Sequence, residues 1–205
     1  MIDFYTAQTS NGQRVAIMLE ECELAYAVHK IDLQGGGNRK PEFLAVNPAG
    51  AIPAIVDHDG PGGKPLALAQ SGAIIFYLAE KTGRFLPKDA ARRAQAVQWM
   101  MQATTDVAAA SAGIFVLSNL APDKSEANIA FFEERTLKYL RAADQRLADR
   151  PYLAEELSVA DFALYPICVV RRPLIDRAGD LKNLVRWADE LGARPGVQRG
   201  MSAAK

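Results

Sequence analysis

Residues Asn47 to Asp57 read Asn-Pro-Ala-Gly-Ala-Ile-Pro-Ala-Ile-Val-Asp, and this stretch decides the fold. The apolar run from Ile52 to Val56 is typical of a short buried strand, but Pro53 stands near its start, where a ladder N–H is normally needed. If the Ile52–Pro53 bond is cis, the chain turns sharply and the backbone N–H and C=O of Ile52 point outward, where another peptide can bind them. The alternative is a trans proline that merely opens an edge strand.

The composition is that of an ordinary globular protein. The chain has 205 residues, of which 49% are hydrophobic and 23% are charged, enough for a large core in one or two domains. Lysine plus arginine (24) equals aspartate plus glutamate (24), so no net field attracts nucleic acid or an acidic membrane. The first residues do not resemble a secretory signal, and no apolar run looks long enough to cross a bilayer. We therefore expect a cytoplasmic protein without nucleic-acid or membrane partners.

The two cysteines and two histidines do not form a metal-ligand pattern. Cys22 and Cys168 lie far apart in helical patterns, without a CxxC spacing, and are predicted to be small buried apolar residues. His29 and His58 have no second ligand nearby in the sequence. No metal site is predicted.

The first 82 residues alternate between strand and helix patterns. The Gly35-Gly36-Gly37 run lacks the Lys-Ser/Thr of a phosphate-binding loop and is interpreted as a mobile loop. The order predicts a small α/β layer of βαβ-α-ββα type. Its elements are a strand at 2–6, a helix with its apolar face on Val15, Met18, Leu19 and Cys22, a strand at 26–33, a short helix at 41–46, a strand opening at Pro53, a strand at 66–69 and a helix at 71–82 capped by Ser71.

From Asp89 onward only helical patterns appear. Strands followed by helices alone argue for two domains, predicted at 1–82 and 89–205, with a linker at 83–88. The predicted helices are 90–119, a second to about residue 150 behind the capping-box variant Asp123-x-x-Glu126, a third behind the capping box Ser158-Val-Ala-Asp161 that contains Pro166 and ends at Pro173, and a last one from Leu181 to Leu191.

An α/β unit whose third strand opens with Ile-Pro, followed by a helical domain, resembles the cytosolic glutathione transferases. Asn47-Pro48-x-Gly50-x-Ile52-Pro53-Ala54 resembles the family's glutathione-binding loop, Gln70-Ser71-x-Ala73-Ile74 its γ-glutamyl site, and Ser158-Val-Ala-Asp161 its helical-domain capping box. The resemblance covers nearly the whole chain and implies a thioredoxin-like first domain with a mixed four-stranded sheet. Thr9-Ser-Asn11-Gly12 and Ala54-Ile-Val-Asp-His58 are most similar to the bacterial nu class and its fungal prion-forming relative.

The resemblance implies a binding site for glutathione, used as a co-substrate. Pro53 would be cis, and the Ile52 backbone would pair with the cysteinyl part of glutathione like an added strand. Gln70 and Ser71 would hold the carboxylate and amine of the γ-glutamyl group. The start of a helix also favours an anion at Ser71, although a plain N-cap is the alternative role of this serine and both can hold at once.

The sequence departs from the family pattern at two positions. Ala51 stands where the family often has a lysine or arginine near the glycyl carboxylate, so one charge-assisted contact is missing. Asn38, Arg39 or Lys40 from the glycine-rich loop are candidates to replace it. Ser10 occupies a position where nu-like sequences usually have proline.

The chemistry of this family needs a thiolate. A free thiol has a pKa of about 8.5, which falls at a helix N-terminus with hydrogen-bond donors. Thr9-Ser10-Asn11, expected as a loop before the first helix, supplies hydroxyls, an amide and backbone N–H groups. By resemblance to nu-like members, Thr9 and Asn11 are predicted to stabilise the thiolate, with Ser10 as a rival donor and Tyr5 as a weaker candidate. The alternative is a loop followed by an ordinary N-cap.

Three functions are considered. The first is a glutathione transferase that delivers the sulfur to a small hydrophobic electrophile, and the second is glutathione-dependent disulfide reduction in which two glutathiones meet in one site. The third is a non-catalytic interaction module of the same fold. Family members are usually homodimers, and residues 90–119 and 126–150 would form much of the contact. The run Ala108-Ala-Ala-Ser-Ala-Gly113 permits close helix approach, either within one subunit or between two.

Overall fold

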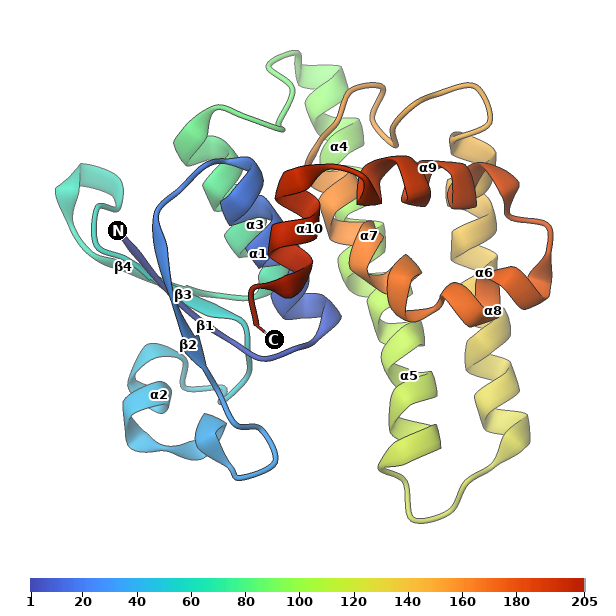
Figure 1. Cartoon of the computed structure of the whole chain (residues 1–205), viewed down its shortest axis with the longest axis horizontal. Coiled ribbons are helices and arrows are strands. Elements are labelled where there is room, and N and C mark those ends of the chain that lie inside the picture. Colours follow the sequence, from blue (N-terminus) through green and yellow to red (C-terminus); the bar gives the residue numbers. More distant parts are fainter. Residues whose placement is uncertain (205) are drawn as a thin grey trace. The chain divides into compact units, whose positions relative to one another are not determined.

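The computed structural model of the protein describes residues 1–204. Its contacts divide the chain into two compact units (Figure 1). The first contains Met1–Arg84 and the residues from Ala193 onward, and the second is Phe85–Gly192. The chain's last helix is thus grouped with the first unit, whereas the sequence assigns it to a helical domain at 89–205. Those domain limits stay a prediction.

The first unit contains a mixed four-stranded sheet in the order β2-β1-β3-β4. β1 runs parallel to β2 and antiparallel to β3, which is antiparallel to β4. This confirms the predicted fold class. The unit consists of β1 (Ile2–Thr6), α1 (Ser10–Glu21), β2 (Tyr26–Lys30), η1 (Gly37–Arg39), α2 (Pro41–Val46), β3 (Ala54–Asp57), η2 (Pro61–Gly63), β4 (Leu66–Ala69), α3 (Ser71–Thr82) and α10 (Pro195–Ser202).

Helices cover both faces of this sheet. β1 alternates, with Phe4 and Thr6 buried on one face. α1 approaches that face closely at Gly12, where a Cβ would come within 2.3 Å of the Thr6 hydroxyl, so the packing requires glycine. On the opposite face Tyr5 contacts Phe43 of α2, with 6.0 Å between ring centroids.

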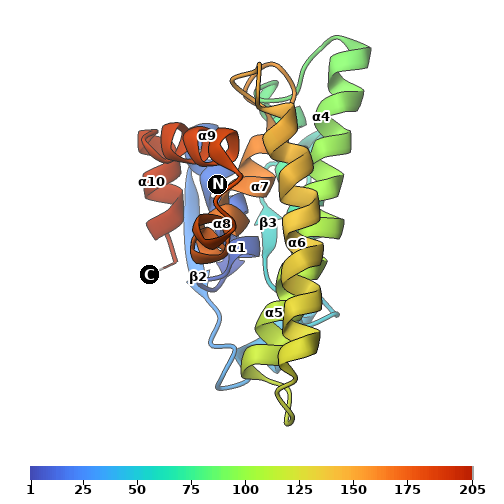
Figure 2. The ribbon, with the colours of Figure 1, turned by 90° about the vertical axis from the view of Figure 1, so that its right-hand side faces the viewer.

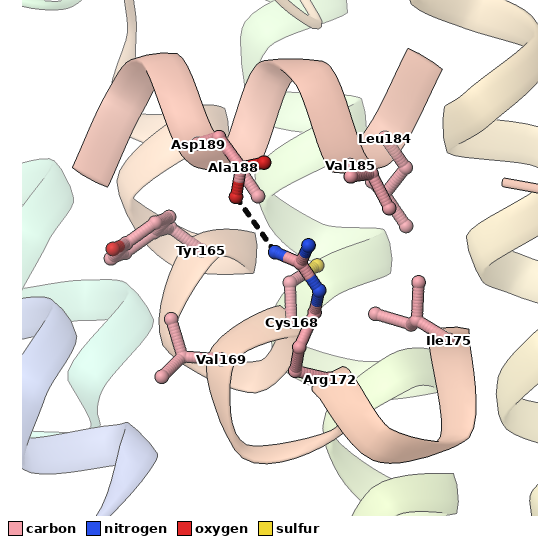
Figure 3. A pocket seen from close by; sticks show the side chains of 9 residues that line it. All are labelled: Tyr165, Cys168, Val169, Arg172, Ile175, Leu184, Val185, Ala188 and Asp189. Atoms are coloured by element: carbon pink, nitrogen blue, oxygen red, sulfur yellow. Dashed lines mark hydrogen bonds and ion pairs between the residues drawn. The ribbon is translucent and has the colours of Figure 1, made fainter. Parts of the chain in front are cut away.

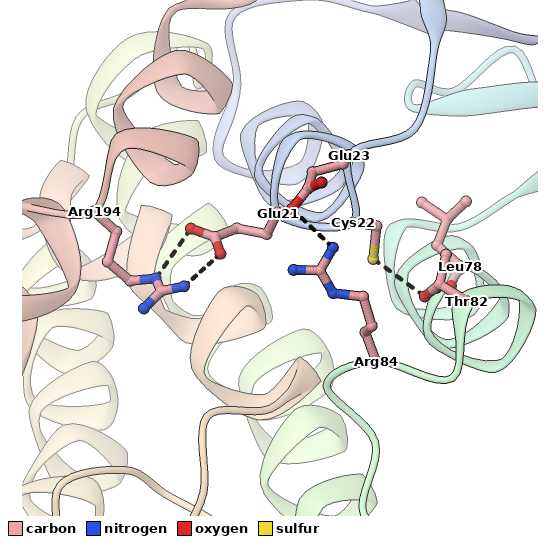
Figure 4. A network of polar contacts seen from close by, with 7 residues as sticks. All are labelled: Glu21, Cys22, Glu23, Leu78, Thr82, Arg84 and Arg194. Carbon is pink, nitrogen blue, oxygen red and sulfur yellow. Dashed lines mark hydrogen bonds and ion pairs between the residues drawn. The ribbon is translucent and has the colours of Figure 1, made fainter.

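α10 lies along α1 within the first unit (Figure 1). At Gly200 a Cβ would come within 2.5 Å of the Ile17 Cα, so the two helices touch through their backbones. Near the end of α1, Glu21 accepts two hydrogen bonds from Arg194, at 3.0 and 2.6 Å (Figure 4). This bidentate ion pair is half-buried and fixes where the C-terminal segment meets α1.

The second unit is helical, as predicted. Residues 90–119 form one continuous helical stretch that contains a π-helical turn, η3. The N-cap of the next helix is Ser125, which accepts from the Asn128 N–H at 3.3 Å, so the Asp123 capping box is wrong. α7 ends at Val170, three residues before Pro173, and Pro173 lies in the first turn of the next helix. The elements are α4 (Ala90–Gln102), η3 (Ala103–Val107), α5 (Ala108–Asn119), α6 (Glu126–Arg146), α7 (Val159–Val170), α8 (Arg172–Ala178) and α9 (Lys182–Gly192).

The small-residue run in α5 serves packing inside the second unit. α5 and α6 lie side by side (Figure 2). A Cβ at Gly113 would come within 2.5 Å of the Phe132 ring of α6, so glycine is required for this approach. At Gly113 the run therefore packs against another helix of the same chain.

The predicted capping box of α7 is present and surrounds a buried carboxylate. Asp161 is completely buried and accepts hydrogen bonds from the Leu153 N–H (3.1 Å), the Ser158 N–H (3.0 Å), the Ser158 hydroxyl (3.1 Å) and the Trp187 indole N–H (3.0 Å). The Ser158 hydroxyl in turn accepts from the Ala160 N–H at 3.3 Å. Every acceptor direction of this carboxylate is thus used for structure.

One helical stretch is longer and more apolar than expected, since no run in the sequence was expected to be able to cross a bilayer. Ala90–Asn119 is long and apolar enough to cross a bilayer by length and composition. The core helix of a soluble protein meets the same criterion. Length and composition therefore do not assign this helix to a membrane.

Candidate functional site

The three predicted glutathione-binding segments meet at one end of the sheet in the first unit. In the strand register, Tyr5 of β1 pairs with Ala54 of β3, and Ala54 pairs with Ala69 of β4. Strand ends that are aligned in this way bring their flanking residues to one edge. Those flanking residues are Thr9–Asn11 after β1, Ile52–Pro53 before β3 and Gln70–Ser71 after β4.

The loop before β3 presents free backbone groups. The Ile52–Pro53 bond is cis, as predicted, and Pro53 is buried. Within residues 1–204, neither the N–H nor the C=O of Ile52 has a hydrogen-bond partner. The loop itself is held by the buried Asn47 side chain, which donates to the Ala51 carbonyl at 2.6 Å and accepts from the Ala49 N–H at 3.2 Å. The Ile52 backbone is therefore held in place without using its own hydrogen-bonding groups.

Asn38 supports the same loop from the glycine-rich segment. Its side-chain N–H donates to the Gly50 carbonyl at 2.7 Å, and Gly50 has a φ of 61°. This bond uses one donor of the Asn38 amide, which was a candidate to bind the glycyl carboxylate of glutathione. Arg39 and Lys40 are exposed and stay candidates for that contact.

The start of α3 lies beside the Ile52 loop. Gln70 is the N-cap, with a φ of 71° and no side-chain capping bond, and its side chain is exposed. Ser71 is the first helical residue, so the expectation that it caps α3 is wrong. Its buried hydroxyl instead accepts a hydrogen bond from Nη1 of Arg14 at 3.2 Å. A positive φ at a residue other than glycine is strained, and such strain concentrates at ligand sites.

The start of α1 carries the residues predicted to stabilise a thiolate. Thr9 is the N-cap, and its hydroxyl oxygen accepts from the Gly12 N–H at 3.1 Å. Ser10 and Asn11 belong to the first turn of α1 instead of a preceding loop, because this cap starts the helix earlier than expected. The Thr9 hydroxyl hydrogen remains available as a donor, and the Asn11 side chain is exposed.

Tyr5 is packed within the sheet region. Its ring stacks on His29, with 4.7 Å between centroids, and burial raises the pKa of its hydroxyl. The two cysteines are also unsuited to act as nucleophiles. Cys22 lies at the far end of α1 with its sulfur 3.4 Å from the Thr82 hydroxyl (Figure 4), and burial raises the pKa of both Cys22 and Cys168. Any reactive sulfur at the start of α1 must therefore come from a ligand.

A cavity of about 140 Å³ lies within the second unit between α7, α8 and α9 (Figure 3). Arg172 and Asp189 form an ion pair of 2.7 Å at its wall, and the buried Cys168 lies behind them. The remaining lining is mostly apolar, and none of the predicted site residues belongs to it. Among residues 1–204, no group of three or more His, Cys, Asp or Glu side chains is placed to hold a metal ion.

Family comparison agrees with this geometry. Residues 10–81 match the model of the glutathione S-transferase N-terminal domain, and residues 101–195 match that of the C-terminal domain. This chain belongs to the glutathione transferase family. The transferase is 37% identical to the disulfide-bond oxidoreductase YfcG of Escherichia coli, over 100% of this chain and 96% of that protein. It is 34% identical to E. coli YghU, also named a disulfide-bond oxidoreductase, over 97% of this chain and 73% of that protein.

Solved structures of other family members resemble the transferase along its full length. A glutathione transferase from Pseudomonas putida, with one glutathione disulfide bound per subunit, has a TM-score of 0.93 at 33% identity, covering 100% of this chain and 92% of that one. A glutathione transferase from Burkholderia graminis, with two glutathione molecules bound per subunit, has a TM-score of 0.93 at 34% identity and coverages of 100% and 88%.

One residue of the candidate site was missed from the sequence. Arg14 reaches the start of α3 from the first turns of α1, and its side chain is buried. The sequence shows only that a charged residue precedes Val15 on the helix, which is also typical of an exposed position. Its burial depends on how α1 and α3 pack together.

Proposed function

We propose that the transferase binds glutathione at the sheet end formed by Thr9–Asn11, Ile52–Pro53 and Gln70–Ser71, and activates its thiol. The observation that carries this proposal is the unpaired Ile52 backbone, held beside two helix N-termini by the strand register. The cysteinyl N–H and C=O of glutathione pair with the C=O and N–H of Ile52, as an added strand would. The γ-glutamyl group then lies at the start of α3.

The thiol of the bound peptide lies at the start of α1. The helix dipole, the Thr9 hydroxyl and the Asn11 amide favour a negative charge there, which lowers the pKa of the thiol from its free value of about 8.5. The thiolate attacks an electrophilic carbon, a C–S bond forms, and the leaving group departs with its electron pair. Ser10 is the alternative donor to the sulfur.

The test is to titrate thiolate absorbance with glutathione bound. A bound thiol pKa clearly below that of free glutathione is expected, and a pKa left at the solution value contradicts the mechanism. Calorimetry on the same samples measures binding itself. Absence of glutathione binding at millimolar concentration supports the non-catalytic interaction module instead.

A second activity, reduction of disulfides, is favoured by two observations. The similar proteins YfcG and YghU are named disulfide-bond oxidoreductases, and the start of α1 carries no cysteine, so glutathione supplies the sulfur. The bound thiolate attacks the glutathione sulfur of a mixed disulfide. Glutathione disulfide forms, and the released thiolate of the substrate takes up a proton. Comparing turnover of a chloronitrobenzene with that of a small mixed disulfide measures each activity, and negligible disulfide turnover excludes reduction.

We also propose a cytoplasmic homodimer. The helices predicted for the contact expose large apolar side chains, including Met101 at 50%, Phe115 at 52% and Phe131 at 60% exposure. Such residues are typical of an interaction surface when they gather on neighbouring helices. Sedimentation at micromolar concentration is expected to give twice the chain mass, and a monomer mass refutes the dimer. Cell fractionation tests the location.

A further inference from the structure

Arg14 is a buried cation with few partners. Its side chain is only 1% exposed, and its one hydrogen bond goes from Nη1 to the Ser71 hydroxyl at 3.2 Å. Among residues 1–204, the Nε and Nη2 groups have no hydrogen-bond partner, and no carboxylate forms an ion pair with Arg14. Buried charges in proteins are normally paired, so this guanidinium is an exception.

The guanidinium is charged under physiological conditions. Burial lowers the pKa of Arg14 to about 10, which is still well above neutral pH. A cation held in this environment attracts an anion more strongly than an exposed one does, because less water screens it. The position of Ser71 at the start of α3 directs that attraction to the end of a helix whose dipole has the same sign.

The hydrogen bond between Arg14 and Ser71 also has a fixed direction. A guanidinium only donates, so the Ser71 oxygen must be the acceptor. The hydrogen of the Ser71 hydroxyl is then free to donate to another group. A ligand oxygen at the start of α3 therefore meets a hydroxyl that is already set as a donor.

We propose that Arg14 is a positioning residue for the α-carboxylate of the γ-glutamyl group, which Ser71 contacts and whose charge neutralises the buried guanidinium. This inference rests on the proposed function. It implies that the transferase selects peptides with a carboxylate at this end. It also implies that the unliganded protein retains an unfavourable charge for the sake of binding.

The test compares two ligands on three variants by calorimetry. The ligands are glutathione and γ-aminobutyryl-cysteinyl-glycine, which lacks only the α-carboxylate. Arg14→Met removes the charge at similar length, Arg14→Lys keeps the charge without the planar fork, and Arg199→Met is the matched control because it breaks an exposed ion pair with Glu20.

Arg14→Met is expected to weaken glutathione binding by about 10- to 100-fold and to leave binding of the analogue unchanged. Arg14→Lys is expected to fall between wild type and Arg14→Met, and Arg199→Met to bind both ligands as wild type does. Without ligand, Arg14→Met is expected to melt at the same temperature as wild type or above it, because an unpaired buried charge is gone. A merely structural role for Arg14 predicts the opposite shift.

Three results overturn the inference. If wild type binds the analogue as tightly as glutathione, the α-carboxylate does not contribute to binding. This result holds even if Arg14→Met does not fold. If Arg14→Met or Arg14→Lys weakens the binding of both ligands equally, Arg14 has only a general structural role. In both cases wild type still binds glutathione, so the proposed function stands. Failure of wild type to bind glutathione at all overturns both proposals together.

Discussion

Asp161 in the second unit and Arg14 in the first are both fully buried charged side chains near the start of a helix, but their surroundings differ. Asp161 accepts hydrogen bonds from backbone, hydroxyl and indole donors. Within the described residues, Arg14 makes a single hydrogen bond, and two of its nitrogens have no partner. The buried carboxylate is fully occupied by the fold, whereas the buried guanidinium is not.

The same contrast extends to the neighbours of each residue. At the sheet end where Arg14 contacts Ser71, the Ile52 backbone has no hydrogen-bond partner among residues 1–204, and the N-cap of α3 has a strained backbone and no capping bond. Around Asp161, the capping box is complete. Polar groups left unused at one end of the sheet point to ligand binding, and a saturated network points to stability. Each of the following substitutions tests this difference.

The largest expected effect is on stability, from Asp161→Ala. The change leaves several buried donors without an acceptor, and we expect a loss of about 3–5 kcal/mol in the free energy of unfolding by urea. Glutathione affinity of the folded variant is expected to stay at the wild-type value. Asp149→Ala, at a side chain that is 73% exposed, is the control and should change stability by less than about 0.5 kcal/mol. A mild effect of Asp161→Ala would contradict the structural role of this network.

Thr9→Ala affects both stability and the thiol. Loss of the N-cap is expected to cost about 1 kcal/mol of stability. Loss of the hydroxyl donor is expected to raise the pKa of bound glutathione, measured by thiolate absorbance. Thr9→Ser keeps both functions and is the control. If the bound thiol pKa is unchanged in Thr9→Ala, the sulfur is stabilised by Asn11 or Ser10 instead.

Gln70→Gly separates stability from binding. Glycine adopts a φ of 71° without strain, so we expect melting to shift upward by the equivalent of about 1 kcal/mol. Glutathione binding is expected to weaken, because the side-chain amide is lost. Glu155→Gly in the second unit relieves a comparable φ of 69° and should leave glutathione affinity unchanged. Unchanged affinity in Gln70→Gly would remove Gln70 from the site.

The smallest expected effect is a pH dependence of stability, which comes from a carboxylate that is hydrogen-bonded but partly exposed. Asp3 of β1 is bonded by His58 at 2.7 Å and by His29 at 2.9 Å, and these bonds hold its pKa below the ordinary value of 3.8. A lowered folded-state pKa gives stability that is present above pH 3.8 and is lost as pH falls through the folded pKa. The free energy of unfolding of wild type, measured with urea, should therefore fall at acid pH more than that of Asp3→Asn. Parallel profiles for the two proteins would contradict this.

Local patterns predicted much of the fold. The β-forming residues of 2–6 and the extended pattern of 66–69 predicted strands whose bounds match β1 and β4, and the Ser158–Asp161 spacing located the start of α7. Helix starts near the site were less predictable. The N-cap of α3 is Gln70, not Ser71 as expected, and α1 begins directly after Thr9, within the segment expected as a loop. Backbone geometry at the strand ends decides where each helix begins.

Part of the candidate site could be predicted, because its segments carry recognisable motifs. The sequence identified the residues beside the three strand ends, and the register explains why they converge. It did not identify Arg14, since burial of a charged residue arises from packing between helices far apart in sequence. The role of each predicted residue toward glutathione stays a prediction.

The contact between α10 and α1 has a consequence for biosynthesis. The ribosome makes α1 well before the helix that packs along it, because Glu21 at the end of α1 and its partner Arg194 are 173 residues apart in the sequence. The first unit is therefore complete only after the whole of the second unit, Phe85–Gly192, has been made. Removal of the residues after Gly192 would therefore uncover α1, the helix whose opposite end carries Thr9.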